Sequence, residues 1–311
     1  MTRKSGNSPA VFVAGFAAAL LTFCLPALLV SQDKTVDDRN RFPWETEQPF
    51  SLDGKAITAA LADHQEPEDH YGFETLFKDI KLDFLADGRV KREDYLVFRY
   101  LSRESASNAH ISESWSPWYE NRPAIKARVI SRRGKIYDLD PETFVEAAND
   151  EISDRVLSDT KRIQAPLPLT NIGAVAEQQV IHEDHRAFSK SGARESVYCG
   201  DYSGTRLWRL TVTAPKDLPL NISQMGIDLP HEKSEQDGLV SYQFVRSDVK
   251  PKTKFEDYLP SNIPTFPTIT VTTTDSWNSI AKEYSAVIDE KISNAEIDDV
   301  LKNLNLSLIH I

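Results

Sequence analysis

The sequence predicts a mainly β protein, an antiparallel β-sandwich with a few short helices, an N-terminal signal or anchor helix and C-terminal helices. Short runs of β-branched and aromatic residues recur along the chain, and turns containing glycine or proline separate them. Two of these turns, around Gly88 and Gly134, lie between strand-like runs and predict β-hairpins. The chain has 311 residues, 40% of them hydrophobic and 27% charged, which is typical of a globular protein.

The N-terminal segment predicts export from the cytoplasm. Arg3 and Lys4 precede an apolar run, residues 10–30, that contains no charged side chain, and this order is typical of an export signal. The run is longer than an ordinary signal core and approaches the roughly 20 residues that span a bilayer. Residues 1–31 therefore form either a cleaved signal peptide or an anchor in the inner membrane. Both alternatives place the body of the protein in the periplasm of a bacterium.

The next segment, residues 32–48, is polar and contains proline, so we interpret it as a linker to a β module over residues 49–275. The module opens with a short helix that Asp53 can cap. Between residues 95 and 100 almost every side chain is bulky, which is typical of a strand covered on both faces. The first predicted elements are the helix at 51–64 and strands at 75–84, 90–101, 111–118, 124–131 and 136–139.

The second half of the module is less regular. Residues 141–168 are predicted to be partly helical, and the proline-rich residues 251–267 are predicted to form an ordered loop. A β-branched strand at 269–271 leads into a helix opened by Trp277. We expect residues 276–311 to be a helical connection toward a downstream domain that this chain lacks. Further strands are predicted at 173–185, 206–214 and 239–245.

Composition and cysteine content limit the function. The formal net charge is −11, and an acidic chain lacks the basic surface that binds nucleic acid. The sequence indicates no cofactor. Cys199 is the only cysteine in the body, so the module has no internal disulfide. Its neighbours carry no signature of a catalytic cysteine, and we expect a buried or inert thiol.

Two polar groupings are weak candidates for chemistry. His182 and His185 are three positions apart, so on a strand they would lie on opposite faces and could not share a metal. Asp138, Asp140 and Glu142 could suggest paired carboxylates, but no second acidic element is recognisable opposite them. We therefore predict no catalytic residue and no metal ligand in this chain.

An aromatic cluster is the remaining candidate site. Trp115, Trp118 and Tyr119 lie together in the sequence WSPWY. Such rings can stack on sugars, and they can equally cover a sandwich core or an interdomain contact. Both alternatives stay open from the sequence.

The order of motifs resembles a bacterial family of domains of unknown function that lie N-terminal to transglutaminase-like domains in exported proteins. The resemblance covers nearly all of the exported body. The matching segments are ADGRVKREDYLVFRYLS (86–102), ARVISRRGKIYDL (127–139), APLPLTNIGAVAEQQV (165–180), RLTVTAPKDLPL (209–220) and PTITVTTTDSWNSIAKEY (267–284).

The resemblance implies a β-sandwich module that has no known activity of its own. It also implies a downstream papain-like domain with catalytic Cys, His and Asp, whose Gly-Asp-Cys motif has no counterpart here. Our leading hypothesis is an exported, non-catalytic module that assists such a domain. Its expected partners are that domain or an envelope component, and the membrane through residues 10–30 if they are not cleaved. The alternatives are a cell-envelope glycan-binding module and a fragment of a transglutaminase-like cysteine peptidase or acyltransferase.

Overall fold

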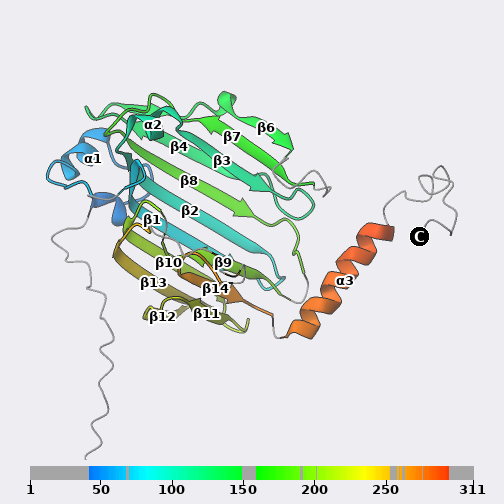
Figure 1. Cartoon of the computed structure of the whole chain (residues 1–311). Helices are drawn as coiled ribbons and strands as arrows, with labels where there is room; N and C mark the ends of the chain where they lie inside the picture. Colours follow the sequence, from blue (N-terminus) through cyan, green and yellow to red (C-terminus); the bar gives the residue numbers. More distant parts are fainter. Residues whose placement is uncertain are drawn as a thin grey trace, which may run out of the picture. The chain divides into compact units, whose positions relative to one another are not determined.

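The computed structural model describes residues 42–67, 70–148, 159–189, 192–200, 202–252, 258, 260, 263–274 and 276–293. Eight strands form one large sheet (Figure 1). They are β1 (Phe73–Phe84), β2 (Val90–Tyr100), β4 (Ala124–Ile130), β5 (Ile136–Asp138), β8 (Val175–Glu183), β10 (Thr205–Pro215), β12 (His231–Gln236) and β13 (Leu239–Val249). Their order across the sheet is β12-β13-β10-β1-β2-β8-β4-β5, and every pair except the parallel β1 and β10 is antiparallel. The predicted mainly β class is confirmed.

Two three-stranded sheets accompany the large one. The first contains β3 (His110–Trp115), β7 (Lys161–Pro166) and β6 (Val145–Ala148) in that order, and the second contains β11 (Asn221–Met225), β14 (Thr268–Thr272) and β9 (Arg194–Tyr198). Val90 of β2 shares a core with β9 and β14, whereas Tyr100 of β2 shares a core with β3 and β7. Because Val90 and Tyr100 are ten residues apart on one strand, they project from the same face. Both small sheets therefore pack on that face.

The opposite face is covered by the start of the described chain. The 3₁₀ helix η2 (Pro43–Glu45) and the helix α1 (Gly54–Ala60) contribute Trp44 and Ile57 to a core that includes Phe77 of β1 and Tyr95 of β2. Asp53 caps α1, as predicted, because its Oδ1 accepts hydrogen bonds from the backbone N–H groups of Lys55 and Ala56 at 2.8 Å. The prediction that β2 is covered on both faces holds only in part, because Tyr95 and Val97 are buried on one face whereas Leu96 and Phe98 on the other are half-buried.

The predicted linker over 32–48 is corrected at its end. Phe42 and Trp44 are 7% and 2% exposed, so the chain is already part of the core there. Two aromatic side chains in a short polar segment are enough to bury it, because each removes a large apolar area from water. Residues 32–41 lie outside the described part of the chain.

Ion pairs are buried on the same face as α1. Arg128 of β4 and Glu177 of β8 lie 2.6 Å apart, and the Tyr95 hydroxyl donates a 2.6 Å hydrogen bond to the same carboxylate. Arg209 of β10 bonds Asp79 of β1 at 2.7 Å. Buried charges are tolerated when they are paired in this way, and these pairs bind neighbouring strands to each other.

The two predicted hairpins, β1–β2 and β4–β5, are confirmed. The prediction that 141–168 is partly helical holds only for the 3₁₀ turn η3 (Pro141–Thr143), because β6 and β7 occupy much of the described remainder. β7 pairs with β3, and its side chains Ile163 and Ala165 are buried. Packing against the rest of the protein therefore determines that this segment is a strand. Residues 149–158 lie outside the description. The sequence prediction omits β9, β11, β12 and the short helix α2 (Arg103–Ser107).

The last described element is the helix α3 (Trp277–Ser293). Ser276 caps it, because its Oγ accepts the backbone N–H of Ser279 at 3.1 Å. Among the helices of the described ranges, none has the length and apolar character needed to cross a membrane. The predicted signal or anchor over 1–31, with its apolar run 10–30, lies outside the described residues, as does 294–311. Export and periplasmic location therefore stay predictions.

Candidate functional site

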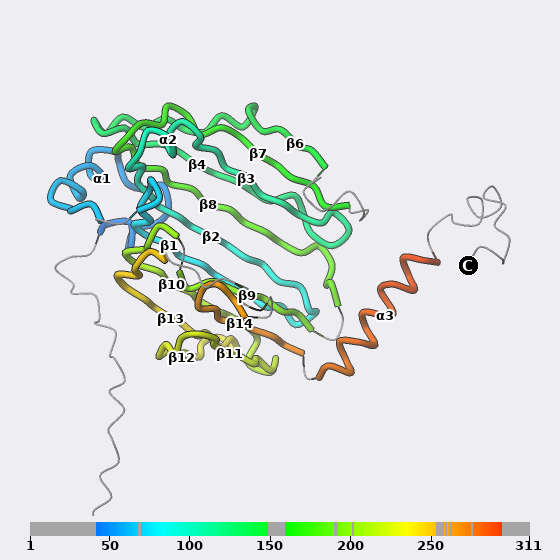
Figure 2. Tube along the Cα trace, viewed as in Figure 1, coloured from blue at the N-terminus to red at the C-terminus, as the bar shows by residue number. Residues whose placement is uncertain are grey.

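Two pockets follow each other along β2 and β8 and together form one feature on the face that carries the two small sheets. Two ion pairs join its floor, formed by β2 and β8, to its walls, formed by β9 and β3. Arg92 Nη1 of β2 lies 3.7 Å from Glu195 Oε2 of β9, and His182 Nε2 of β8 lies 3.3 Å from Glu113 Oε2 of β3. The path of β2 and β8 can be followed in Figure 2. We call this feature the β2 groove. Its floor on β2 is formed by the alternate, same-face residues Arg92, Asp94, Leu96 and Phe98.

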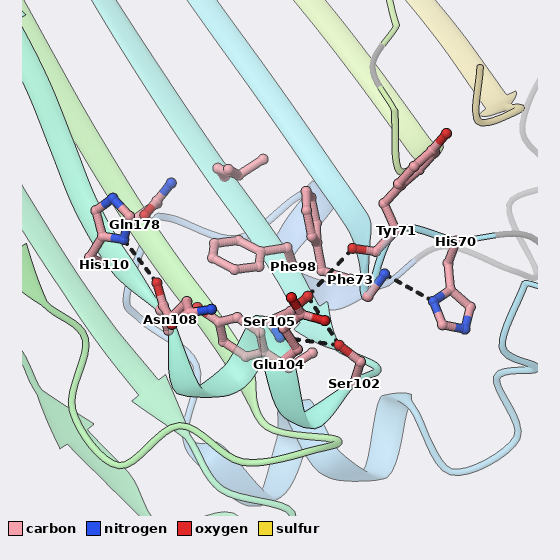
Figure 3. Close-up of a pocket in the computed structure, with 14 residues that line it drawn as sticks. His70, Tyr71, Phe73, Phe98, Ser102, Glu104, Ser105, Asn108, His110 and Gln178 are labelled. Atoms are coloured by element: carbon pink, nitrogen blue, oxygen red, sulfur yellow. Dashed lines mark hydrogen bonds between the residues drawn. The ribbon is translucent and has the colours of Figure 1, made fainter. Parts of the chain in front are cut away.

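One end of the β2 groove, which we call the apolar end, combines aromatic and aliphatic side chains with polar ones such as His70, Glu104 and His110 (Figure 3). It is a pocket of about 820 Å³ lined by Phe73, Leu96, Phe98 and Tyr100, with α2 as one wall. The Phe98 ring contacts Tyr100 and Phe73 edge-on, with centroids 5.2 and 6.1 Å away. This geometry is favourable for aromatic pairs and holds Phe98 in place.

Gly72 sets the position of the α2 wall. Its φ is +89°, and a Cβ atom there would lie 2.0 Å from the Oγ of Ser105. Because only glycine adopts this backbone without strain and leaves that space free, the chain before β1 can pass close to α2. The Gly72 carbonyl then accepts the N–H groups of Leu101 and Ser102 at 2.7 and 3.1 Å. The Ser105 hydroxyl lies at the rim and bonds the Tyr71 carbonyl at 3.4 Å.

The other end of the β2 groove is charged. It is a pocket of about 350 Å³ where Arg92 and His182 meet five carboxylates. Arg92 also donates to Asp94, with Nε 2.7 Å from Oδ2, so one guanidinium lies between carboxylates of the floor and of the β9 wall. The five acidic residues are Asp94, Glu113, Glu120, Asp184 and Glu195.

The pKa values in this pocket reflect crowded negative charge. Burial raises the pKa of Asp184 to about 6, although its carboxylate accepts the Val90 N–H at 2.8 Å. Burial also raises the pKa of Glu195, which the positive charge of Arg92 only partly opposes. Burial alone would lower the pKa of His182, but the hydrogen bond and charge of Glu113 raise it above its usual value. Carboxylates outnumber cations here, and these shifts are typical of functional clefts.

The structure separates the aromatic residues of WSPWY. Trp115 is buried at the end of β3. Trp118 and Tyr119 are half-buried and contact each other and Phe188, with ring centroids 5.1 to 5.4 Å apart. The Lys291 ammonium of α3 lies 4.4 Å from the Trp118 ring centroid. The sugar-stacking hypothesis for these residues stays a prediction.

The remaining candidates have structural roles. Cys199 is buried, and burial raises the pKa of its thiol to about 12. His182 bonds Glu113, whereas His185 lies 3.1 Å from the Pro117 carbonyl, so the two imidazoles have different partners. Asp140 caps η3 by accepting the Glu142 N–H at 2.9 Å. Throughout the ranges that the structure describes, no three His, Cys, Asp or Glu side chains are arranged to hold a metal ion.

Sequence reasoning missed the β2 groove. The period-two pattern of β2, with Arg92 and Asp94 followed by Leu96 and Phe98 on one face, was a usable signal for a floor that changes from charged to apolar. The wall could not be placed, because β9 has only Val197 buried and gives almost no strand pattern.

A family model described as "Domain of Unknown Function with solved-structure structure (DUF3857)" matches residues 86–253, more than half of the chain. The matched region includes β2, β3, β8 and β9, and therefore most of the β2 groove. A search of curated proteins found no match.

Solved structures similar to this chain have low sequence identity, and of the three described here the first shows the same fold. A crystal structure from Parabacteroides distasonis, described as that of a "putative protease", is 13% identical with a TM-score of 0.62, and the match covers 74% of this chain and 45% of that one. An M1 zinc metallopeptidase mutant from Deinococcus radiodurans is 13% identical with a TM-score of 0.35, and the match covers 65% of this chain and 42% of that one. Aminopeptidase A from Legionella pneumophila is 10% identical with a TM-score of 0.34, and the match covers 68% of this chain and 22% of that one. The chain thus spans less than half the length of these structures.

Proposed function

The chain belongs to the DUF3857 family, and from this premise we propose that it is a non-catalytic accessory module of an exported protein that carries a transglutaminase-like domain. The chain spans less than half of the Parabacteroides protein, which leaves room in such proteins for a separate catalytic region. The observation that carries the proposal is the exposed apolar face of α3.

That face is a stripe of four side chains. Ile280, Tyr284, Ile288 and Ile292 follow one another at intervals of four residues and are 37%, 54%, 40% and 57% exposed. Residues four apart lie on the same side of an α-helix. A continuous apolar stripe on an exposed helix is typical of a surface that another protein element covers. We assign that element to the transglutaminase-like domain.

α3 contacts the loops that follow β3 and β8. Arg186 lies 3.4 Å from Glu290 of α3, and its guanidinium is 5.0 Å from the centroid of the Trp118 ring. Lys291 approaches the same ring. These cation–π contacts on the half-buried Trp118 support the interdomain role of the aromatic cluster, because they join the cluster to the helix that carries the stripe.

The chemistry of Cys199 supports an accessory role for this module. A cysteine nucleophile must be a thiolate, and a base or positive charge usually lowers its pKa. Burial here has the opposite effect and raises the pKa to about 12. The thiol of Cys199 is therefore neutral at pH 7 and is a part of the core.

The experiment that tests the proposal begins with the genomic DNA that follows the codon for Ile311. If the reading frame continues into a Gly-Asp-Cys motif with later His and Asp codons, that region encodes the partner domain. The partner domain is then purified separately. We expect this domain to bind the chain, and Ile288→Glu to weaken binding by about tenfold, about 1.4 kcal/mol. Lys282→Glu, on an exposed part of the same helix, is the matched control. A stop codon after Ile311, or acyl-transfer or peptidase activity of the chain itself, would overturn the proposal.

A further inference from the structure

We propose that the β2 groove binds an extended peptide that places a lysine or arginine side chain in the charged end and a bulky apolar side chain in the apolar end. This inference goes beyond the accessory role, because it needs only the residues of the described module. It would hold whether or not a transglutaminase-like domain follows.

The dimensions of the groove suit an extended chain. The floor of β2 from Arg92 to Phe98 contains seven residues, and the six steps between them span about 20 Å at the usual strand rise of about 3.3 Å per residue. The two pockets have volumes of about 820 and 350 Å³. The two pockets follow each other along one strand, with Asp94 lining the charged pocket and Leu96 the apolar one, which favours a single extended strand of about six or seven residues over a folded surface.

The apolar end supplies most of the buried area for a ligand. Leu96, Phe98 and Phe73 present aliphatic and aromatic surface to the pocket. Gln178 lies beside Leu96 on the floor, because the two are paired in register across β2 and β8. Its carboxamide both donates and accepts hydrogen bonds, as a peptide backbone in the groove requires. Further polar side chains, among them Glu104 and His110, line the same pocket, and a mixture of apolar surface and polar groups is typical of a binding pocket.

The charged end decides which ligand fits. Five carboxylates surround one guanidinium and one imidazole, so the pocket is negative at neutral pH. A cleft lined by one sign of charge concentrates its field and favours a ligand of the opposite sign. A lysine or arginine head placed among Glu113, Glu195 and Asp94 would reduce the repulsion between them. An acidic or phosphorylated ligand would increase it.

The test uses the whole chain, purified in detergent, and two pools of fluorescein-labelled heptapeptides. One pool fixes Lys at the first position and Phe at the sixth, and the other has the reverse order, with the remaining positions varied. Matched pools carry Gln in place of Lys, and binding is measured by fluorescence anisotropy. We expect a lysine pool to bind about tenfold more tightly than its glutamine counterpart. A steep loss of binding between low and high salt should accompany this preference.

The matched variant is the double substitution Glu113→Gln and Glu195→Gln. It removes charge from both walls while keeping side-chain size, and we expect it to abolish the preference for lysine. Glu232→Gln, on the exposed strand β12, makes the same kind of change outside the groove and should leave the preference intact. Thermal melting of each variant shows whether it is folded.

Several results would overturn the proposal. These are equal binding of the lysine and glutamine pools, and no binding of any pool at about 1 mM. Loss of binding in EDTA would assign the charged end to a metal ion. Displacement of the peptides by chitohexaose at lower concentration than by unlabelled peptide would assign the groove to a glycan. An unchanged preference for lysine in the folded double variant would place the peptide elsewhere on the surface.

Discussion

Arg92 of β2 lies 3.7 Å from Glu195 of β9, and this pair joins the large sheet to the small sheet that forms one wall of the β2 groove. Arg92 also bonds Asp94 on its own strand. The two carboxylates would repel each other without the guanidinium between them, so Arg92 keeps the charged end of the groove intact.

Replacement of Arg92 is expected to destabilise the protein in a pH-dependent way. In Arg92→Ala the carboxylates of Asp94 and Glu195 lose their shared cation, and the pKa of Glu195 should rise further. We expect a loss of about 1 kcal/mol in the free energy of unfolding at pH 7. The loss should be smaller at pH 4.5, where the raised pKa of Glu195 favours its protonated form. Urea unfolding at the two pH values measures this, and an equal loss at both would show that Arg92 acts by packing alone.

Asp184 gives a second pH-dependent prediction. Its effect on the free energy of unfolding has the opposite pH dependence to that of an ordinary salt-bridged carboxylate. Its pKa is raised from 3.8 to about 6 in the folded state. The stability that its protonated form contributes is present in full below about pH 4 and is lost as the pH rises through 6. Asp184→Asn should therefore stabilise the protein at pH 7.5 relative to the unsubstituted chain and change little at pH 4.

The expected gain from Asp184→Asn at pH 7.5 is about 1 kcal/mol, after allowance for solvent screening of a half-buried group. The amide oxygen can still accept the Val90 N–H, so the local hydrogen bond is kept. Asp217→Asn, in an exposed turn, is the control. Denaturant unfolding across this pH range is the measurement. A similar destabilisation at both ends of the range would contradict the assigned pKa.

The hairpins were predictable because their signals are local. Gly88 and Gly134 have φ values of +85° and +76°, which the turns require and which glycine supplies. The β1–β10 pair was not, because it is parallel and joins Asp79 to Arg209 across 130 residues. Turn residues predict only the pairing of strands that are neighbours in the sequence, so they do not indicate a pairing between strands so far apart.

The site was harder to predict than the fold. Trp115 and Trp118 are only three positions apart in the sequence, yet Trp115 is in the protein interior and Trp118 contacts α3. The β2 groove forms because both small sheets pack on the same face of β2, which the sequence does not indicate. Taken alone, Arg92 looks like an ordinary charged residue near a turn. Only the stacking of β9 over β2 turns Arg92 and Glu195 into one site.

Trp118→Ala is predicted to release α3 without unfolding the module. The substitution removes the ring that Arg186 and Lys291 approach, and such exposed cation–π contacts contribute about 0.5–1 kcal/mol each. We expect faster amide exchange in α3, measured by hydrogen–deuterium exchange, while β2 and β8 stay protected. The same variant tests glycan binding, because a peptidoglycan pulldown that is unchanged in Trp118→Ala excludes this ring as a sugar platform. Unchanged exchange in α3 would show that the helix is held by other contacts.

The buried pair of Arg128 and Glu177 is expected to be the most sensitive polar contact of the fold. Glu177 is 3% exposed and accepts hydrogen bonds from Arg128 and from the Tyr95 hydroxyl. Glu177→Ala leaves the Arg128 guanidinium buried without its carboxylate, which typically costs about 3–5 kcal/mol. Glu183→Ala, at the exposed end of the same strand, should change stability by less than about 0.5 kcal/mol. Urea unfolding at pH 7 compares the two. A loss at Glu177 as small as that at Glu183 would mean that water reaches Arg128 and that α1 does not seal this face of the sheet.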